Sequence, residues 1–301
     1  MSEMPDIDWE ILVGRIRAGR CVPFLGAAAN ISSVSLKYKG TPLGADVSKK
    51  LAATLAVGPR DPENLPRVSL HLEVRKDRPY LEEQIEKLID AGSCQPSPLL
   101  RLLAELPFDL IVTTNYDCLM EQALKEAGRD YRVLVQPPLG FRPNAPELAA
   151  LAGYTGVIVY KIHGTFGDGD RASSDLILTE EDYIVFLTAV TGTADRIGVP
   201  NLITGRLQTR SLLFLGYGLE DWDFQVLYKT LVESLESRKK FKSYAIQKSP
   251  NQDWKLFWEK KGVVIYDCDV YAFAAGLRGQ YPFPPPPGPA IPPPRAADSN
   301  A

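Results

Sequence analysis

The sequence has few of the residues that build metal sites, membrane spans or nucleic-acid interfaces. Among its 301 residues are two histidines and four cysteines, and no pair of cysteines has the spacing of metal ligands. No apolar run approaches the roughly 20 residues that cross a bilayer, and the acidic residues 1–9 lack a signal-peptide core. A formal net charge of −3 gives no reason to expect nucleic acid as a main partner. We therefore expect a cytoplasmic protein with no metal, no membrane contact and no nucleic-acid partner.

Apolar runs separated by helical patterns predict an α/β fold. Short β-branched and apolar runs are typical of buried strands, and apolar residues three or four apart are typical of helices. Predicted strands cover residues 21–25, 109–114, 131–135, 157–162, 211–215, 244–246 and 263–266. Predicted helices include residues 9–16, 119–127, 180–186 and 224–235. Strands that alternate with helices favour a doubly wound, Rossmann-like parallel sheet.

Two segments depart from this alternation. A helical stretch at about residues 43–106 predicts an inserted cap beside the sheet, and its first helix is expected to start at Thr41-Pro42 and run to about Ala56. Nine prolines between residues 282 and 294 favour extended polyproline II. We expect a folded domain at residues 1–280 and a proline-rich linker or tail at 281–301, which could once have led to a further domain.

Polar side chains follow two of the predicted strands directly. Thr114, Asn115 and Asp117 come after the run Leu-Ile-Val at 110–112, and His163 and Gly164 come after the strand at 157–162. The carboxyl ends of the strands are where an open α/β sheet binds its ligand. The two segments therefore predict a site that contains an amide, a carboxylate and an imidazole.

Small residues follow two further strands. Gly26, Ala27, Ala28 and Asn30 lie after the strand at 21–25, and Gly216-Tyr217-Gly218 lie after the strand at 211–215. Such turns let a backbone approach a phosphate closely, as a nucleotide across the strand ends would require. On residue pattern alone, Asn115 and Asp117 could equally cap the helix after them, and His163 could be an ordinary loop histidine. The other histidine, His71, stands among charged residues and is expected at the surface.

The order of these motifs resembles the sirtuin fold, in the sirtuin-like NAD hydrolase domains of prokaryotic antiphage defence proteins. The resemblance covers most of residues 10–270. It rests on the loop at 26–30, Thr-Thr-Asn-Tyr-Asp at 113–117, Lys-Ile-His-Gly at 161–164, the segment 179–183 and Gly-Tyr-Gly-Leu-Glu-Asp at 216–221.

The resemblance implies an NAD glycohydrolase, which cleaves NAD to nicotinamide and ADP-ribose through an oxocarbenium-like transition state. Asn115 would hold the ribose hydroxyls or a water, and Asp117 would contact the nicotinamide carboxamide. His163 would act as general base, which suits an imidazole that titrates near neutral pH. NAD is then a substrate, and no metal is expected. The residues that would bind it are Gly26, Ala27, Ala28, Asn30, Thr114, Asp117, Gly164, Gly216, Tyr217 and Gly218.

Two departures from the family pattern leave other functions open. The first loop has Ala28 and Asn30 where relatives usually carry a glycine and a serine, so a non-catalytic NAD- or nucleotide-binding regulatory module is the alternative. Residues 165–179 hold no cysteine, so the four-cysteine zinc module of protein-deacylating sirtuins is missing. This argues against a protein deacylase, and we place the deacylase and an ADP-ribosyltransferase together as the less favoured functions. A further alternative is a pure interaction scaffold, which would neither bind nor cleave NAD. As an NAD-depleting effector of antiviral defence, the protein is expected to be a homo-oligomer, or to be restrained by a partner protein or a missing C-terminal sensor domain.

Overall fold

The protein is built on one seven-stranded sheet, seen in a computed structural model that describes residues 5–33, 35–55, 60–167, 175–190, 192, 195–220, 222–229 and 241–282. The strand order is β3-β4-β2-β1-β5-β6-β7, and all neighbouring pairs are parallel. The strands are β1 (Cys21–Leu25), β2 (Leu110–Thr113), β3 (Tyr131–Val135), β4 (Val157–Lys161), β5 (Ser211–Leu215), β6 (Ser243–Gln247) and β7 (Val263–Asp267). This topology confirms the predicted doubly wound α/β class.

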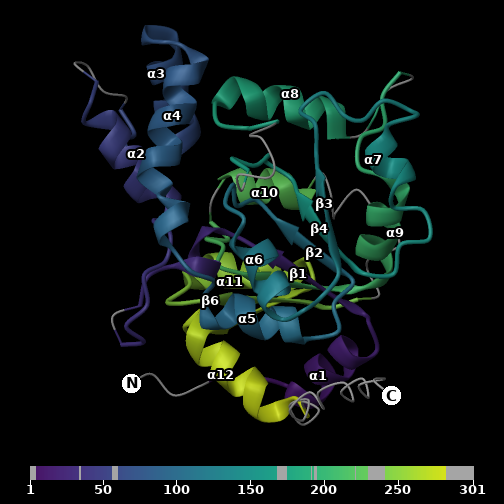
Figure 1. Cartoon of the computed structure of the whole chain (residues 1–301). Helices are drawn as coiled ribbons and strands as arrows, with labels where there is room; N and C mark the ends of the chain where they lie inside the picture. Colours follow the sequence, from purple (N-terminus) through teal and green to yellow (C-terminus); the bar gives the residue numbers. More distant parts are fainter. Residues whose placement is uncertain are drawn as a thin grey trace, which may run out of the picture.

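Helices cover both faces of the sheet (Figure 1). One face packs against α1 (Trp9–Arg17), α5 (Pro98–Glu105), α6 (Leu119–Glu126) and α12 (Val270–Gln280). The other packs against α8 (Glu180–Val190), α9 (Asn201–Thr209), α10 (Trp222–Tyr228) and α11 (Gln252–Lys260), with the short α7 (Pro146–Ala149) beside them. Because β1, β2, β4 and β5 are buried along their whole length, they appear in the sequence as continuous apolar runs rather than as alternating ones.

A helical cap stands to one side of the sheet. It comprises α2 (Gly44–Ala52), α3 (Leu65–Arg75) and α4 (Arg78–Ile89), and Figure 1 shows these helices grouped together. They share a small core of their own, which Leu176 and Leu178 from the other half of the chain complete. The last helix of the predicted insertion, α5, packs instead in the layer against the sheet. Its apolar face belongs to the main core.

Some local predictions differ from the structure. A helix start at Thr41-Pro42 is wrong, because α2 begins at Gly44 and the Thr41 amide donates to the Asn30 carbonyl at 3.0 Å. That contact ties Thr41 to the loop after β1 in a short parallel bridge with Ile31. The predicted helix at 224–235 is described only to Lys229, and the proline-rich segment from residue 283 lies outside the described residues. Within the described part, no helix combines the length and apolarity needed to cross a membrane.

Candidate functional site

The predicted site lies where the chain reverses its direction across the sheet. β2, β3 and β4, which follow β1 in the chain, all lie on one side of β1 in the sheet. β5, the next strand in the chain, pairs with β1 on its other side. The point between β1 and β5 is therefore the topological switch point, the usual place for a ligand in an open α/β sheet. Four adjacent strands, β4, β2, β1 and β5, end at this edge, and each is followed by one of the predicted motifs.

The loops after β1 and β5 contact each other directly through their backbones. The Gly26 amide donates to the Leu215 carbonyl at 2.9 Å, and the Ala28 amide donates to the Gly216 carbonyl at 3.0 Å. Gly216 has φ +77°, and a Cβ there would lie 2.1 Å from the Ala29 nitrogen. A Cβ on Gly26 would lie 2.6 Å from the Gly216 carbonyl oxygen. Both glycines are therefore required for the two loops to meet.

Ala27, Ala28 and Asn30 belong to a single 3₁₀ turn, η1 (Ala27–Asn30). The two alanines are half-buried. The Asn30 side chain is fully buried, and its Oδ1 accepts from the Ser97 amide at 2.8 Å. That side chain links the loop to the start of α5, and the contact of Asn30 with substrate stays a prediction.

Asn115 lies against the first loop. Its side-chain Nδ2 donates to the Gly26 carbonyl at 3.2 Å, and its backbone amide donates to Thr113 Oγ1 at 3.0 Å. Its side chain is half-buried. The hydrogen bond from Asn115 Nδ2 to the Gly26 carbonyl thus fixes the orientation of the carboxamide and leaves its oxygen, Oδ1, as an acceptor.

Thr114 and Tyr217 join the ends of three strands. Thr114 Oγ1 lies 3.2 Å from the Tyr217 hydroxyl, and that hydroxyl donates to the Leu25 carbonyl at 3.1 Å. The Tyr217 ring packs on Phe224, with ring centroids 5.0 Å apart. Gly218 follows as a half-buried link to Leu219. The structure therefore brings Gly26, Thr114, Asn115, Gly216 and Tyr217 together.

A buried ion pair lies under the Asn115 loop. Lys161 and Glu121 are almost fully enclosed, and the Lys161 Nζ lies 3.2 Å from Glu121 Oε1. The same Nζ donates to the backbone carbonyl of Asp117. Burial alone would lower the pKa of Lys161, but the Glu121 carboxylate and its neighbours hold that pKa above its usual value. The lysine that ends β4 therefore keeps its charge and ties the Asn115 loop to the strand that carries His163.

The Asp117 carboxyl is buried below this loop. Its Oδ1 accepts from the Leu119 amide at 3.0 Å, at the start of α6. Burial raises the pKa of Asp117, although the nearby Lys161 ammonium lowers it. Asp117 therefore accepts the first amide of α6 from the position before the N-cap residue Cys118, and it also lies in the loop of the predicted site.

His163 is enclosed by aromatic side chains. The residue is 4% exposed, and its Nδ1 lies 3.4 Å from the Tyr183 hydroxyl. The rings of Tyr183 and Phe186 meet it edge-on, with centroids 5.1 and 5.9 Å away. Burial lowers the pKa of His163 to about 3. The prediction that this imidazole titrates near neutral pH is therefore wrong for this structure.

Gly164 lets the chain turn away directly after His163. Its φ is +85°, and a Cβ there would lie 2.4 Å from the Asp175 carbonyl oxygen. The approaching segment, residues 175–179, is termed the strap here. The strap's Ile177 amide donates to the His163 carbonyl at 3.0 Å, so the turn and the strap fit together only because residue 164 lacks a side chain.

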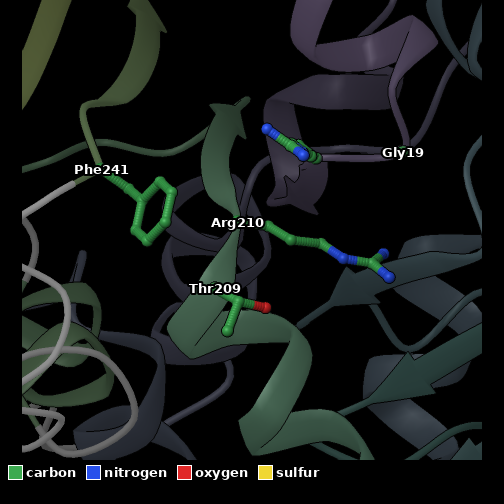
Figure 2. Close-up of a pocket in the computed structure, with 5 residues that line it drawn as sticks. Gly19, Thr209, Arg210 and Phe241 are labelled. Atoms are coloured by element: carbon green, nitrogen blue, oxygen red, sulfur yellow. The ribbon is translucent and has the colours of Figure 1, made fainter.

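A surface pocket lies at the opposite edge of the sheet (Figure 2). Its lining residues precede strands: Gly19 and Arg20 come before β1, Thr209 and Arg210 before β5, and Phe241 before β6. Arg210 pairs there with Asp109 at 3.0 Å. The pocket is thus separated from the predicted site by the length of the strands. Among the described residues, no group of three or more His, Cys, Asp or Glu side chains is arranged to hold a metal ion.

Three residues that the predicted set of site residues did not include shape this site. Lys161 was visible as a lysine closing an apolar strand, and a buried position for it required a buried partner. Tyr183 stands at the first turn of a helix that the capping pattern predicted, and the Thr179–Asp182 cap forms, with the Asp182 amide donating to Thr179 Oγ1 at 3.1 Å. Arg78 carried no motif of its own. Its contacts come from segments about 100 residues away in the chain.

The fold is a doubly wound parallel α/β sheet, and the predicted motifs follow four adjacent strands around its switch point. The SIR2-like domain family matches residues 109–266, more than half of the chain, and the chain belongs to this family. The curated relatives include an NAD(+) hydrolase ThsA from Cytobacillus dafuensis, 33% identical over 127 residues, which are 42% of this chain and 22% of that protein. Defense-associated sirtuin 2 from Bacillus subtilis is 26% identical over 161 residues, 52% of this chain and 14% of that protein.

The chain therefore spans about a quarter or less of the length of the relatives it matches. A solved structure described as "Structural Basis for the Mechanism and Regulation of Sir2 Enzymes" covers 92% of this chain and 97% of its own, at 15% identity and a TM-score of 0.45.

Proposed function

We propose that this chain is an NAD glycohydrolase that releases nicotinamide and ADP-ribose. The observation that carries the proposal is that the Asn115 and His163 loops meet beside the switch point, where the loops after β1 and β5 touch through Gly26 and Gly216. Small residues would face the phosphates, and the polar residues would face the nicotinamide ribose. The names of the NAD(+) hydrolase relatives support this assignment.

The proposed reaction breaks the bond between ribose C1′ and the nicotinamide nitrogen. The bonding electrons pass to the pyridinium ring, and water adds to the oxocarbenium-like C1′. The Asn115 carboxamide oxygen would accept from a ribose hydroxyl or from that water. The Asp117 carboxyl would contact the nicotinamide carboxamide. Neutral His163 would take the proton that the water loses.

The low basicity of His163 is compatible with this reaction. An oxocarbenium ion is strongly electrophilic, so a base weaker than an ordinary imidazole still suffices to take the proton of the attacking water. With Tyr183 accepting from Nδ1–H, the other ring nitrogen would carry the lone pair that receives the proton. The catalytic residues in this proposal are Asn115 and His163, and no metal takes part.

The biological role proposed is depletion of NAD in antiviral defence, in keeping with the name of the Bacillus subtilis relative. Such an activity requires restraint, so we propose a cytoplasmic homo-oligomer that a partner protein or an additional sensor domain controls. Within this proposal, residues 1–280 form the catalytic domain and residues 281–301 form a linker or tail.

One observation favours a second function, a nucleotide-binding module without turnover. His163 is 4% exposed, and burial lowers its pKa to about 3, so a general base of ordinary strength is absent. In that case, the glycine loops would bind NAD and the histidine would only support the fold.

Two measurements on the same sample separate these functions. The purified chain is incubated with NAD, nicotinamide and ADP-ribose are quantified, and NAD binding is followed by calorimetry. The proposal predicts equal amounts of both products and a loss of turnover in Asn115→Ala. Binding without products would select the binding module, and nicotinamide release that requires an acylated peptide would select a deacylase.

A further inference from the structure

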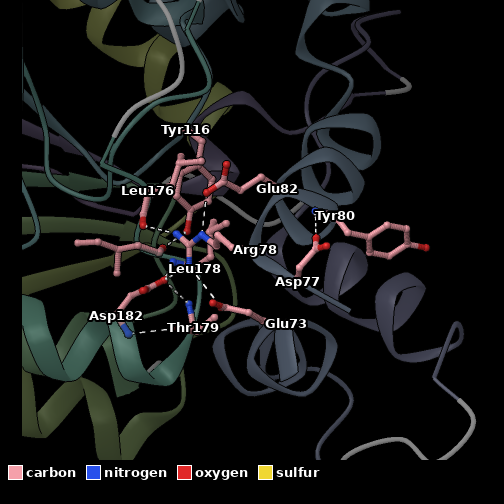
Figure 3. Close-up of polar contacts among 11 residues, drawn as sticks. Glu73, Asp77, Arg78, Tyr80, Glu82, Tyr116, Leu176, Leu178, Thr179 and Asp182 are labelled. Carbon is pink, nitrogen blue, oxygen red and sulfur yellow. Dashed lines mark hydrogen bonds and ion pairs between the residues drawn. The ribbon is translucent and has the colours of Figure 1, made fainter. Parts of the chain in front are cut away.

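Arg78 is the point where the cap meets the rest of the chain (Figure 3). It is the first residue of α4, and its side chain is 28% exposed. Each nitrogen of the guanidinium makes a contact. Nε donates to Glu82 Oε1 at 2.7 Å, Nη1 to Asp182 Oδ2 at 2.7 Å, and Nη2 to the Leu176 carbonyl at 2.6 Å. A planar fork of donors can reach all three acceptors at once, whereas a lysine ammonium cannot.

The acceptors fix the strap at both ends. Leu176 lies within the strap, and Asp182 lies just beyond it in the first turn of α8. Asp182 Oδ2 also accepts from the amides of Leu178 and Thr179, at 2.8 and 2.9 Å. A single carboxylate thus joins the guanidinium to the strap backbone, and Figure 3 shows these groups converging around Arg78.

The strap in turn holds both loops of the proposed site. The Ile177 amide donates to the His163 carbonyl at 3.0 Å, and the Ile177 carbonyl accepts from the Tyr116 hydroxyl at 2.7 Å. Tyr116 stands directly after Asn115. One strap residue therefore contacts the loop of each proposed catalytic residue.

Side-chain packing separates the two faces of the strap. Leu176 and Leu178 are buried in the core of the cap, and Ile177 is buried in the core of the sheet. The strap is therefore a layer between cap and site. Its position depends on how firmly the cap is attached, and Arg78 makes the charged and polar contacts that reach the strap through Asp182 and Leu176.

We propose that Arg78 is a positioning residue for NAD cleavage, acting through the strap on the loops of Asn115 and His163. This inference rests on the proposed function. It also makes a separate claim about structure: the cap is coupled to the nicotinamide-ribose side of the site and not to the phosphate side. The loops at 26–30 and 216–218 make none of the contacts described for Arg78.

The kinetic test compares Arg78→Gln with the full-length wild type. We expect kcat to fall by about tenfold or more, because small displacements of catalytic groups are costly, while KM for NAD changes less than about threefold. Arg78→Lys keeps the positive charge but loses the planar set of guanidinium donors, so it should have an intermediate kcat. The matched control is Arg67→Gln. Arg67 also joins the cap to α8, by an ion pair with Glu180 at 2.9 Å, but among the described residues its side chain makes no hydrogen bond or ion pair with the strap.

Three kinetic results would overturn the inference. The first is a wild-type kcat in Arg78→Gln, and the second is an equal loss in Arg67→Gln. The third is a lowered melting temperature with unchanged kcat per folded molecule, which would reduce Arg78 to a stabilising residue.

Hydrogen exchange provides a readout that does not need activity. The Ile177 amide, bonded to the His163 carbonyl, should exchange about tenfold faster or more in Arg78→Gln and at the wild-type rate in Arg67→Gln. If the wild type does not hydrolyse NAD, the proposed function has failed, and this exchange measurement still decides whether Arg78 positions the strap. Unchanged protection in Arg78→Gln would overturn the inference whatever the activity.

Discussion

Acidification should destabilise this protein through His163. Burial lowers the pKa of the folded-state imidazole to about 3, against an ordinary value of 6.5. Between these two pH values, His163 therefore binds a proton in the unfolded chain but not in the native state. The stability contributed by the neutral, buried ring is fully present above pH 6.5 and is lost progressively as the pH falls from 6.5 towards 3.

The size of the effect follows from the two pKa values. Between them, the free energy of unfolding falls by about 1.4 kcal/mol for each pH unit. From about pH 7 to about pH 5, His163 alone should account for a loss of about 2 kcal/mol. His163 as a whole is 4% exposed, so solvent screening does little to reduce this figure.

Urea unfolding at the two pH values, for wild type and His163→Gln, measures this contribution. Glutamine is neutral at both pH values, so the variant should lose about 2 kcal/mol less than the wild type on acidification. Other titrating groups are common to both proteins and cancel in the difference. An equal loss of unfolding free energy in the two proteins would refute the claim that His163 is buried and neutral in the native state.

Two further substitutions test the supports of the site. Lys161→Met leaves the buried Glu121 carboxylate without its partner, so urea unfolding should show a loss of about 3–5 kcal/mol, most of it recovered when Glu121→Leu is added; a wild-type midpoint for the single variant would contradict the ion pair. Gly216→Ala places a Cβ 2.1 Å from the Ala29 nitrogen, so calorimetry should show loss of NAD binding. Its control is Gly205→Ala on α9, where a Cβ meets nothing within 4 Å, and which should bind normally and gain up to about 1 kcal/mol of stability; equal binding by both variants would contradict the close contact of the two loops.

The sheet could be predicted from the sequence because its central strands are buried on both faces. Residues 21–25 and 211–215 are largely apolar runs that are each followed by a glycine, and they match β1 and β5 residue for residue. Helix starts depended on longer-range contacts. The Thr41-Pro42 signature is a good local cap, but the bond from Thr41 to the Asn30 carbonyl takes precedence. The Asp269 cap of α12, which accepts from the Tyr271 amide at 2.8 Å, was a readable signal that went unused.

The site was only partly predictable, for a physical reason. Parallel strands bring their carboxyl ends to one edge, so the proximity of the Asn115 and His163 loops followed from the strand pattern. The environment of His163 did not follow, because its burial depends on Tyr183 and Phe186 from a helix that begins 17 residues further along the chain. Arg78 could not be recognised at all, since its role depends on where the cap docks.

The central claim is that Asn115 and His163 cleave NAD at the ends of β2 and β4. Initial rates of nicotinamide release test it most directly, for wild type, Asn115→Ala, His163→Ala and the matched control His71→Ala, which changes the exposed second histidine on α3. The account predicts turnover by wild type and by His71→Ala, and a fall of about 100-fold or more in both site variants with the fold intact. Wild-type rates in Asn115→Ala and His163→Ala, or no turnover by the wild type itself, would contradict it.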